Sequence, residues 1–154
     1  IFINMTEQDI FKVQNLWSEG IIKMGQISDD RQSLEIYVSD FLDRLYNFDN
    51  QVLFKPTKAK DTQFRNDKNS AISYFIAGND RECDEDTGFA LSNWSKITFE
   101  NKDIILGEEH AIAMGNYTFE NNNSKIKVEF SFGYIKVNGL VKINLHHSSI
   151  PFQG

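Results

Sequence analysis

Cysteine is almost absent from this sequence. Its 154 residues contain one, Cys83, so no intrachain disulfide can form. A secreted fold held together by disulfides is therefore excluded. Cys83 lies in the acidic run Asp80–Asp86, and negative charge nearby disfavours the thiolate that a nucleophilic cysteine requires. We expect no cysteine chemistry.

Metal ligands are also scarce. The only histidines are His110, His146 and His147, whereas a catalytic zinc site typically uses three protein ligands and one open position. Adjacent residues of a strand point to opposite faces, so His146 and His147 cannot both bind one ion without a kink. The acidic run Asp80–Asp86 lacks the glycine and glutamate spacing of a calcium-binding loop. The sequence predicts no cofactor.

Positive charge and long apolar runs are lacking too. The 16 Lys and Arg residues against 22 Asp and Glu residues give a net charge of −6, which disfavours binding to a nucleic acid backbone. No apolar run approaches the roughly 20 residues of a membrane-spanning helix. The first residues, Ile1–Asn4, include neither an initiator methionine nor a basic and apolar leader. We therefore expect residues 1–154 to be a single domain, cut from a longer precursor or a processed product.

Phenylalanine, by contrast, is abundant. The sequence has 13 Phe, five Tyr and two Trp residues, and 40% of its residues are hydrophobic. Phe supplies apolar area without a polar group. A chain of this length and composition can bury a large, dry core.

Apolar residues recur at helical spacing in three segments of the N-terminal half. Thr6 can cap a first helix, answered by an acid three residues later, and Gly25 is a plausible stop. The spacing predicts a second helix over residues 30–47 and a third over residues 67–77.

From Trp94 onward the apolar residues alternate as in strands. The segment 126–134 alternates cleanly, Asn138-Gly139 is a strong hairpin signal, and a last strand follows over residues 141–145. We therefore predict an α+β fold, in which N-terminal helices pack on one face of a curved antiparallel sheet. Glycines inside the strand patterns favour bends, which would make the sheet cone-shaped with a cavity under the helices.

The clearest polar motif on the apolar pattern is His146-His147-Ser148-Ser149, at the end of the last strand. His147 and Ser149 continue the apolar alternation, which would place them on the helix-covered face. A bulge near Pro151 would exchange the two pairs and place His146 and Ser148 there instead. The sequence leaves both arrangements open.

Two further polar residues fall near the predicted cavity. Thr57 follows the rigid bend at Pro56 and could present its hydroxyl to the cavity mouth. Tyr74 lies inside the apolar third helix, where a buried tyrosine usually finds a partner for its hydroxyl. Taken alone, each has a simpler structural interpretation, as a turn residue and as a core residue.

Taken together, several segments resemble the iota class of carbonic anhydrases, over residues from about 16 to 152. The most specific is Leu145–Pro151, which contains the His-His-Ser-Ser motif. The others are Leu53–Thr57, Ala71–Phe75, Gly88–Ala90, Phe99–Asn101 and Ala113–Tyr117. More loosely, the pattern is similar to nuclear transport factor 2-like cones, which include the association domain of calcium/calmodulin-dependent kinase II and ketosteroid isomerase-like enzymes.

The resemblance implies reversible hydration of carbon dioxide to bicarbonate. In metal-free members a Thr, a Tyr, a Ser and a His are associated with bicarbonate. By motif, Thr57 and Tyr74 match the first two, and the Ser and His fall within the four residues His146, His147, Ser148 and Ser149. Because an unperturbed histidine titrates near neutral pH, we expect it to be the base, with the hydroxyls orienting water and bicarbonate.

The resemblance also implies a homodimer, and either no cofactor or, as in other members, manganese or zinc. It suggests the plastid of an alga, with the bacterial cytoplasm or periplasm as alternatives. Because algal members often occur as tandem domains, it also implies that residues 1–154 are one domain of a longer or tandem-repeat precursor. The competing function is a non-catalytic cone that binds a small ligand or oligomerises. An isomerase would need a carboxylate base in the cavity, and no Asp or Glu interrupts the predicted apolar faces.

Overall fold

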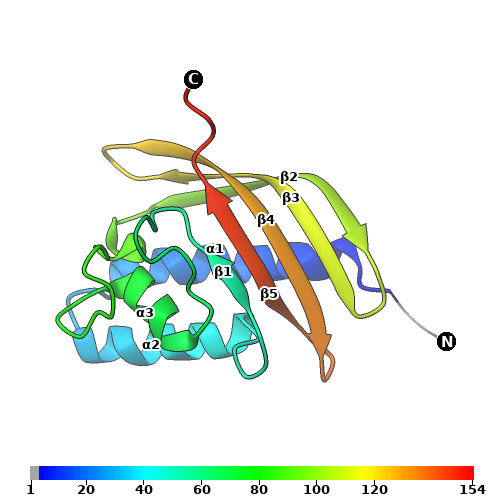
Figure 1. Cartoon of the computed structure of the whole chain (residues 1–154), viewed down its shortest axis with the longest axis horizontal. Helices are drawn as coiled ribbons and strands as arrows, with labels where there is room; N and C mark the ends of the chain where they lie inside the picture. Colours follow the sequence, from blue (N-terminus) through cyan, green and yellow to red (C-terminus); the bar gives the residue numbers. More distant parts are fainter. Residues whose placement is uncertain (1–3) are drawn as a thin grey trace.

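The computed structural model describes residues 4–154, in which helices and one five-stranded sheet form two layers (Figure 1). In chain order the elements are α1 (Glu7–Gln26), α2 (Arg31–Leu45), β1 (Leu53–Lys55), α3 (Lys68–Ile76), the short 3₁₀ helix η1 (Phe89–Leu91), β2 (Lys96–Leu106), β3 (His110–Glu120), β4 (Lys125–Val137) and β5 (Leu140–Ser149). The predicted α+β class is confirmed, and the short strand β1 is the one strand that precedes α3. None of the helices in this part of the chain combines the length and apolar character needed to cross a membrane.

The helices begin where the sequence offers capping side chains. At the start of α1, the backbone N–H of Thr6 donates to Asp9 Oδ2 at 2.8 Å, and the backbone N–H of Asp9 donates to Thr6 Oγ1 at 3.2 Å. This is the predicted capping box. Asp30 and Asp67 cap α2 and α3 without a reciprocal bond, each accepting from the backbone N–H three residues later.

The prediction that Gly25 ends α1 is wrong. The helix continues through Gly25 to Gln26. A Cβ at Gly25 would lie 3.3 Å from the carbonyl oxygen of Ala90 in η1. This glycine therefore allows close packing between α1 and η1 and does not terminate the helix.

The sheet has the strand order β1-β5-β4-β3-β2, with β1 parallel to β5 and all other neighbours antiparallel. Its ladders shift register at two places, opposite Gly115 in β3 and beside Gly133 in β4. At Gly115 a Cβ would collide with the backbone of the bulged strand β2. The bends expected at glycines within the strands therefore occur as bulges in the strands opposite Gly115 and Gly133, in β2 and β5, and bulges of this kind curve a sheet.

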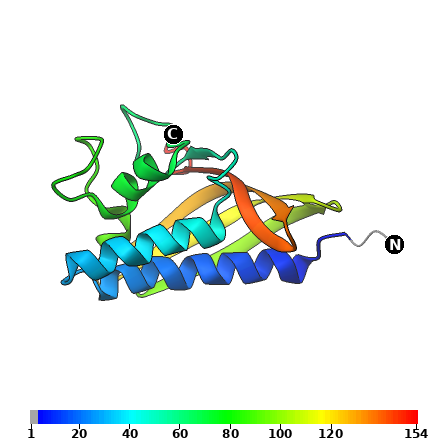
Figure 2. The same ribbon diagram turned by 90° about the horizontal axis from the view of Figure 1, so that it is seen from below.

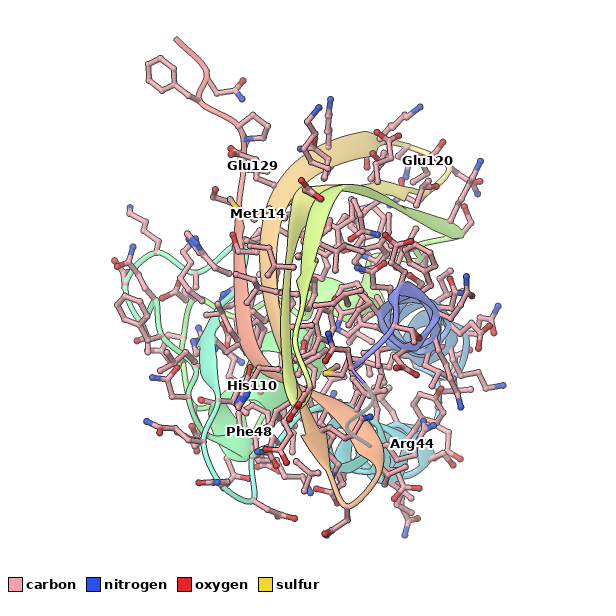
Figure 3. The ribbon with its side chains drawn as sticks, turned by 90° about the vertical axis from the view of Figure 1, so that its right-hand side faces the viewer. Arg44, Phe48, His110, Met114, Glu120 and Glu129 are labelled. Atoms are coloured by element: carbon pink, nitrogen blue, oxygen red, sulfur yellow. The ribbon has the colours of Figure 1, made fainter. Side chains whose placement is uncertain are left out.

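One face of the sheet carries the core, and the other is open. The helices lie against one side of the strands (Figures 1 and 2). Trp17 of α1 is buried at the centre, with its ring 6.5 Å from Phe75 of α3 and 6.3 Å from Phe132 of β4, between centroids. In a view along the sheet, Met114 of β3 lies on the side away from α1 (Figure 3).

Candidate functional site

The register of β5 is set by one extra residue. Gly133 of β4 pairs with Leu145, whereas its neighbour Tyr134 pairs with Ile143, so Asn144 has no partner and forms a bulge in β5. A bulge interrupts the alternation of side chains between the two faces. Residues after Asn144 therefore face opposite to what uninterrupted alternation from Ile143 predicts.

This bulge settles which half of the motif faces the core. His146 and Ser148 point inward and are 2% and 1% exposed. His147 is exposed, and Ser149, half-buried, lies on the same outer face. The exchange considered from the sequence does occur, but its cause lies before the motif and not near Pro151.

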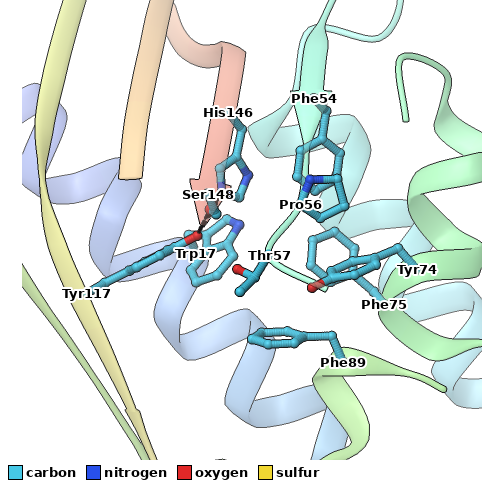
Figure 4. Close-up of a pocket in the computed structure, with 10 residues that line it drawn as sticks. All are labelled: Trp17, Phe54, Pro56, Thr57, Tyr74, Phe75, Phe89, Tyr117, His146 and Ser148. Carbon is cyan, nitrogen blue, oxygen red and sulfur yellow. Dashed lines mark hydrogen bonds between the residues drawn. The ribbon is translucent and has the colours of Figure 1, made fainter. Parts of the chain in front are cut away.

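His146 and Ser148 line a small pocket between the sheet and the helices (Figure 4), and Thr57 and Tyr74 line the same pocket. Four of the six candidates from the sequence are thus brought together, and His147 and Ser149 are not. The space left for water-sized molecules is about 10 Å³, close to the minimum for one water. The other lining residues are Trp17, Phe54, Pro56, Phe75, Phe89 and Tyr117.

Strand β1 and helix α3 bring Thr57 and Tyr74 to this place. Phe54 of β1 pairs with His146 of β5, so the chain that leaves β1 passes alongside the end of the His-His-Ser-Ser motif. Thr57 follows, and the backbone N–H of Lys58 donates to Tyr74 Oη at 3.2 Å. This contact ties α3 to the turn after β1. Thr57 is the one lining residue that is not fully buried, so the pocket opens on its side.

The ring of His146 is held by hydrogen bonds at both nitrogens. Its Nδ1 lies 2.8 Å from Tyr46 Oη, and its Nε2 lies 2.9 Å from Tyr117 Oη and 3.1 Å from Ser148 Oγ. Tyr117 and Ser148 are hydrogen-bonded to each other, and Tyr46 Oη accepts from Trp17 Nε1 at 2.9 Å. A continuous chain of side chains therefore runs from α1 to the pocket.

Aromatic rings enclose the same imidazole. Phe132 and Phe54 stack on His146 with ring centroids 4.1 and 4.6 Å away. Burial lowers the pKa of His146 well below its usual value, with a smaller contribution from His147. His146 is therefore neutral at neutral pH.

The phenols around the pocket keep their protons. Burial raises the pKa of Tyr46, Tyr74 and Tyr117 above the usual value near 10, more than their hydrogen bonds lower it. Each therefore remains a hydroxyl that can donate as well as accept. The pocket is accordingly rich in neutral donors.

Carboxylates do not line the pocket. The buried acid nearby, Asp86, is paired with Arg65 through two contacts of 2.8 Å and accepts from Ser73 Oγ at 2.6 Å. Its hydrogen-bonding capacity is used to fix the loop after α3. Within residues 4–154, no three His, Cys, Asp or Glu side chains come together as a metal site.

Three residues of the site were missed from the sequence: Trp17, Tyr46 and Tyr117. Each lies on a predicted apolar face, where an aromatic residue is ordinarily part of the core. The one available signal was the polar atom of each ring, since a buried Trp or Tyr needs a hydrogen-bond partner. Their spacing gave no indication that Trp17 would bond to Tyr46, or that the two tyrosines would bond to His146.

Two sequence comparisons relate this chain to known proteins over nearly its whole length. The sequence model of the family "metal-independent carbonic anhydrase" matches residues 8–150. A curated protein of that name from Nostoc sp. (strain PCC 7120 / SAG 25.82 / UTEX 2576) is 31% identical over an alignment 155 residues long, which covers 97% of this chain and 75% of that protein.

Solved structures of other proteins share the fold of this chain. An iota-carbonic anhydrase from a cyanobacterium, complexed with bicarbonate, aligns with a TM-score of 0.92 at 28% identity over 100% of this chain and 97% of that one. An NTF-2 like protein from Shewanella oneidensis MR-1, of unknown function, shares the fold, with a TM-score of 0.60 at 18% identity over 94% and 99% of the two chains. The chain therefore belongs to the metal-independent carbonic anhydrases.

Proposed function

We propose that this pocket hydrates carbon dioxide reversibly to bicarbonate without a bound metal ion. In hydration, the oxygen of a water forms a bond to carbon, one C=O π electron pair moves onto oxygen, and a proton leaves to solvent. The observation that carries the proposal is the convergence of four hydroxyls and one neutral imidazole on one buried space: Thr57, Tyr74, Tyr117, Ser148 and His146. The bicarbonate in the cyanobacterial relative supports the choice of substrate.

Hydroxyl donors would do in this pocket what a metal ion does elsewhere. Negative charge develops on oxygen as bicarbonate forms, and donors fixed in a dry site stabilise it. Tyr74, Tyr117 and Ser148 are buried and held by hydrogen bonds, so they need little reorganisation as the charge appears.

The apolar walls favour the uncharged substrate. Phe54, Phe75 and Phe89 line the pocket beside the hydroxyls. Carbon dioxide carries no charge and no net dipole, so it loses little hydration free energy when it leaves water for these walls. Bicarbonate has four heavy atoms, whereas the pocket has room for about one water. Binding therefore requires the walls to move apart, and the half-buried Thr57 marks the side that opens.

Removing metal and removing single hydroxyls test this function. After treatment with a chelator and a check for residual metal, the protein should keep its rate of carbon dioxide hydration, measured by stopped-flow acidification. Thr57→Ala and Tyr74→Phe should each lower kcat/KM by about 100-fold, as loss of an oxyanion donor does. Tyr37→Phe, in α2 outside the pocket, is the matched control.

Two results would contradict the proposal. Loss of activity on demetallation, with recovery on adding manganese or zinc, would make the enzyme metal-dependent. Unchanged rates in folded Thr57→Ala and Tyr74→Phe would place the reaction elsewhere.

We further propose that the chain forms a homodimer through the outer face of the sheet. Apolar side chains from four of the five strands lie in one row there, Leu53, Leu145, Ile112 and Ile105, and Gly133 of β4 lies between Leu145 and Ile112. Leu53, Ile112 and Ile105 are 52%, 50% and 66% exposed, and contiguous apolar patches commonly mark protein interfaces. Light scattering should give a dimer mass, and Ile112→Lys should give a monomer. A monomer mass for the unchanged protein would refute the dimer.

A further inference from the structure

The hydrogen bonds behind His146 fix which group donates to which. Trp17 Nε1–H can only donate, so at 2.9 Å Tyr46 Oη must accept. The remaining partner of Tyr46 Oη is Nδ1 of His146, at 2.8 Å. Because all three side chains are buried, a hydroxyl hydrogen that did not point to Nδ1 would have no acceptor, and orphaned buried donors are costly.

We propose that Tyr46, held by Trp17, is a positioning residue that keeps neutral His146 in the tautomer with its proton on Nε2. This rests on the proposed function, because Nε2 is the nitrogen that faces the reacting pocket. Which ring nitrogen carries the proton is set by the hydrogen bond at the other nitrogen. The stacked rings of Phe54 and Phe132 hold the imidazole in the plane that these bonds require.

The tautomer decides how many hydrogens face the substrate. Nε2, Tyr117 Oη and Ser148 Oγ form a triangle in which every pair is in contact. If Nε2 carries a proton, it donates to one of the two hydroxyl oxygens and cannot accept. One hydroxyl then donates to the other, and the second hydroxyl hydrogen is free to point into the pocket. If Nε2 were an acceptor, both hydroxyl hydrogens would be used inside the triangle. The Nε2–H tautomer therefore provides one O–H donor for an oxygen of bicarbonate.

His146 then acts as a donor and not as the base. Its unprotonated nitrogen faces Tyr46, away from the substrate, so it cannot take the proton of the attacking water directly. That proton passes to a solvent water at the open side of the pocket, beside Thr57. This assignment departs from the expectation drawn from the sequence, in which a histidine removes the proton.

The tautomer can be observed without any activity measurement. In protein labelled with 15N-histidine, ring nitrogen shifts at neutral pH report which nitrogen is protonated and whether the other accepts a hydrogen bond. His146→Gln assigns the signals by removing them. We expect the proton on Nε2, and Tyr46→Phe should move the Nδ1 resonance downfield because its hydrogen bond is lost.

Tyr134→Phe is the matched control, since the Tyr134 hydroxyl is equally buried but accepts from Gln14 at 3.1 Å and does not bond to His146. It should leave both His146 resonances unchanged. A proton on Nδ1 in the unchanged protein, or an Nδ1 resonance that ignores Tyr46→Phe, would overturn the proposal.

Two substitutions of His146 separate a donor from a base. Glutamine keeps an N–H near the position of Nε2 but cannot act as a base, whereas leucine fills the space and does neither. For a donor, we expect His146→Gln to retain hydration within about 10-fold, and His146→Leu to lose about 100-fold or more. Equal losses in the two folded variants would indicate a base and overturn the assignment. If hydration required metal, the proposed function would fail, while the NMR result would still decide the tautomer.

Discussion

Strand β5 places the same two residue types on opposite faces of one sheet. His146 and Ser148 are buried, hydrogen-bonded and enclosed by aromatic rings. His147 and Ser149, each one position further along, lie on the outer face, and the His147 ring is exposed. Identity and chain position hardly differ between the two pairs, so their different chemistry comes from what surrounds them.

The surroundings act in two ways. Removal from water lowers the pKa of His146 and raises the pKa of Tyr117, so both are neutral in the pocket. Fixed partners then give each neutral group a direction in which to donate. On the outer face, by contrast, His147 is exposed and Ser149 is half-buried. Substitutions that are matched across the sheet can test this contrast.

The largest expected difference is in stability. Phe132 is 1% exposed and stacks on His146, whereas Phe64 is 67% exposed beside the outer edge strand. Phe132→Ala should lower the free energy of unfolding by about 3–5 kcal/mol, because it leaves a cavity in a packed core. Phe64→Ala should stay within about 0.5 kcal/mol. Urea denaturation measures both, and similar losses would mean that the inner face is not the tighter-packed one.

The sequence predicted the helices and the strand alternation well, because capping residues and apolar spacing are local signals. The bulge at Asn144 could not be recognised from the sequence, because the residue that follows it on the outer face is apolar. Leu145 continues the apolar alternation from Ile143, yet it points outward, where it pairs with Leu53 in the apolar row of that face. An apolar residue on an open face cannot be told from a core residue by alternation alone.

The hydrogen bonds that link Trp17, Tyr46 and His146 could not be predicted from local sequence patterns, for a different reason. Tyr46 looked like one more residue on the apolar side of the second helix, but it caps α2 and bonds to His146, 100 positions away. Contacts at that separation depend on how α1, α2 and β5 pack. The resemblance to a family predicted Thr57, Tyr74 and the histidine motif as site residues. The residues that orient them, such as Tyr46, could be recognised only from the three-dimensional structure.

A smaller but more specific difference is expected in catalysis. Ser148→Ala removes the hydroxyl that contacts both His146 Nε2 and Tyr117 Oη. We expect kcat/KM for carbon dioxide hydration to fall by about 100-fold, or about 2.7 kcal/mol in the barrier. Ser149→Ala, on the outer face, should leave the rate unchanged in the same stopped-flow assay. A comparable fall in both variants would show that the inner pair has no special role.

The smallest expected difference is in how stability depends on pH. The pKa of His146 is lowered in the folded chain from about 6.5 in the unfolded chain. Between these two values the unfolded chain binds more protons, so the free energy of unfolding falls as the pH decreases below about 6.5. Above that pH His146 is neutral in both states and no longer lowers the free energy of unfolding. Below it, the free energy of unfolding falls by at most about 1.4 kcal/mol per pH unit for one proton.

Paired variants isolate this contribution from that of the many carboxylates. His146→Gln should have a flatter stability curve between about pH 6.5 and 5 than the unchanged protein, because no buried imidazole remains to be protonated. His147→Gln, on the outer face, leaves the buried imidazole in place and removes only the smaller contribution of His147, so it should keep most of the slope. Denaturant titrations at several pH values give both curves. If removing the outer histidine flattened the curve as much as removing the inner one, burial on the helix-covered face would not be the cause of the lowered pKa.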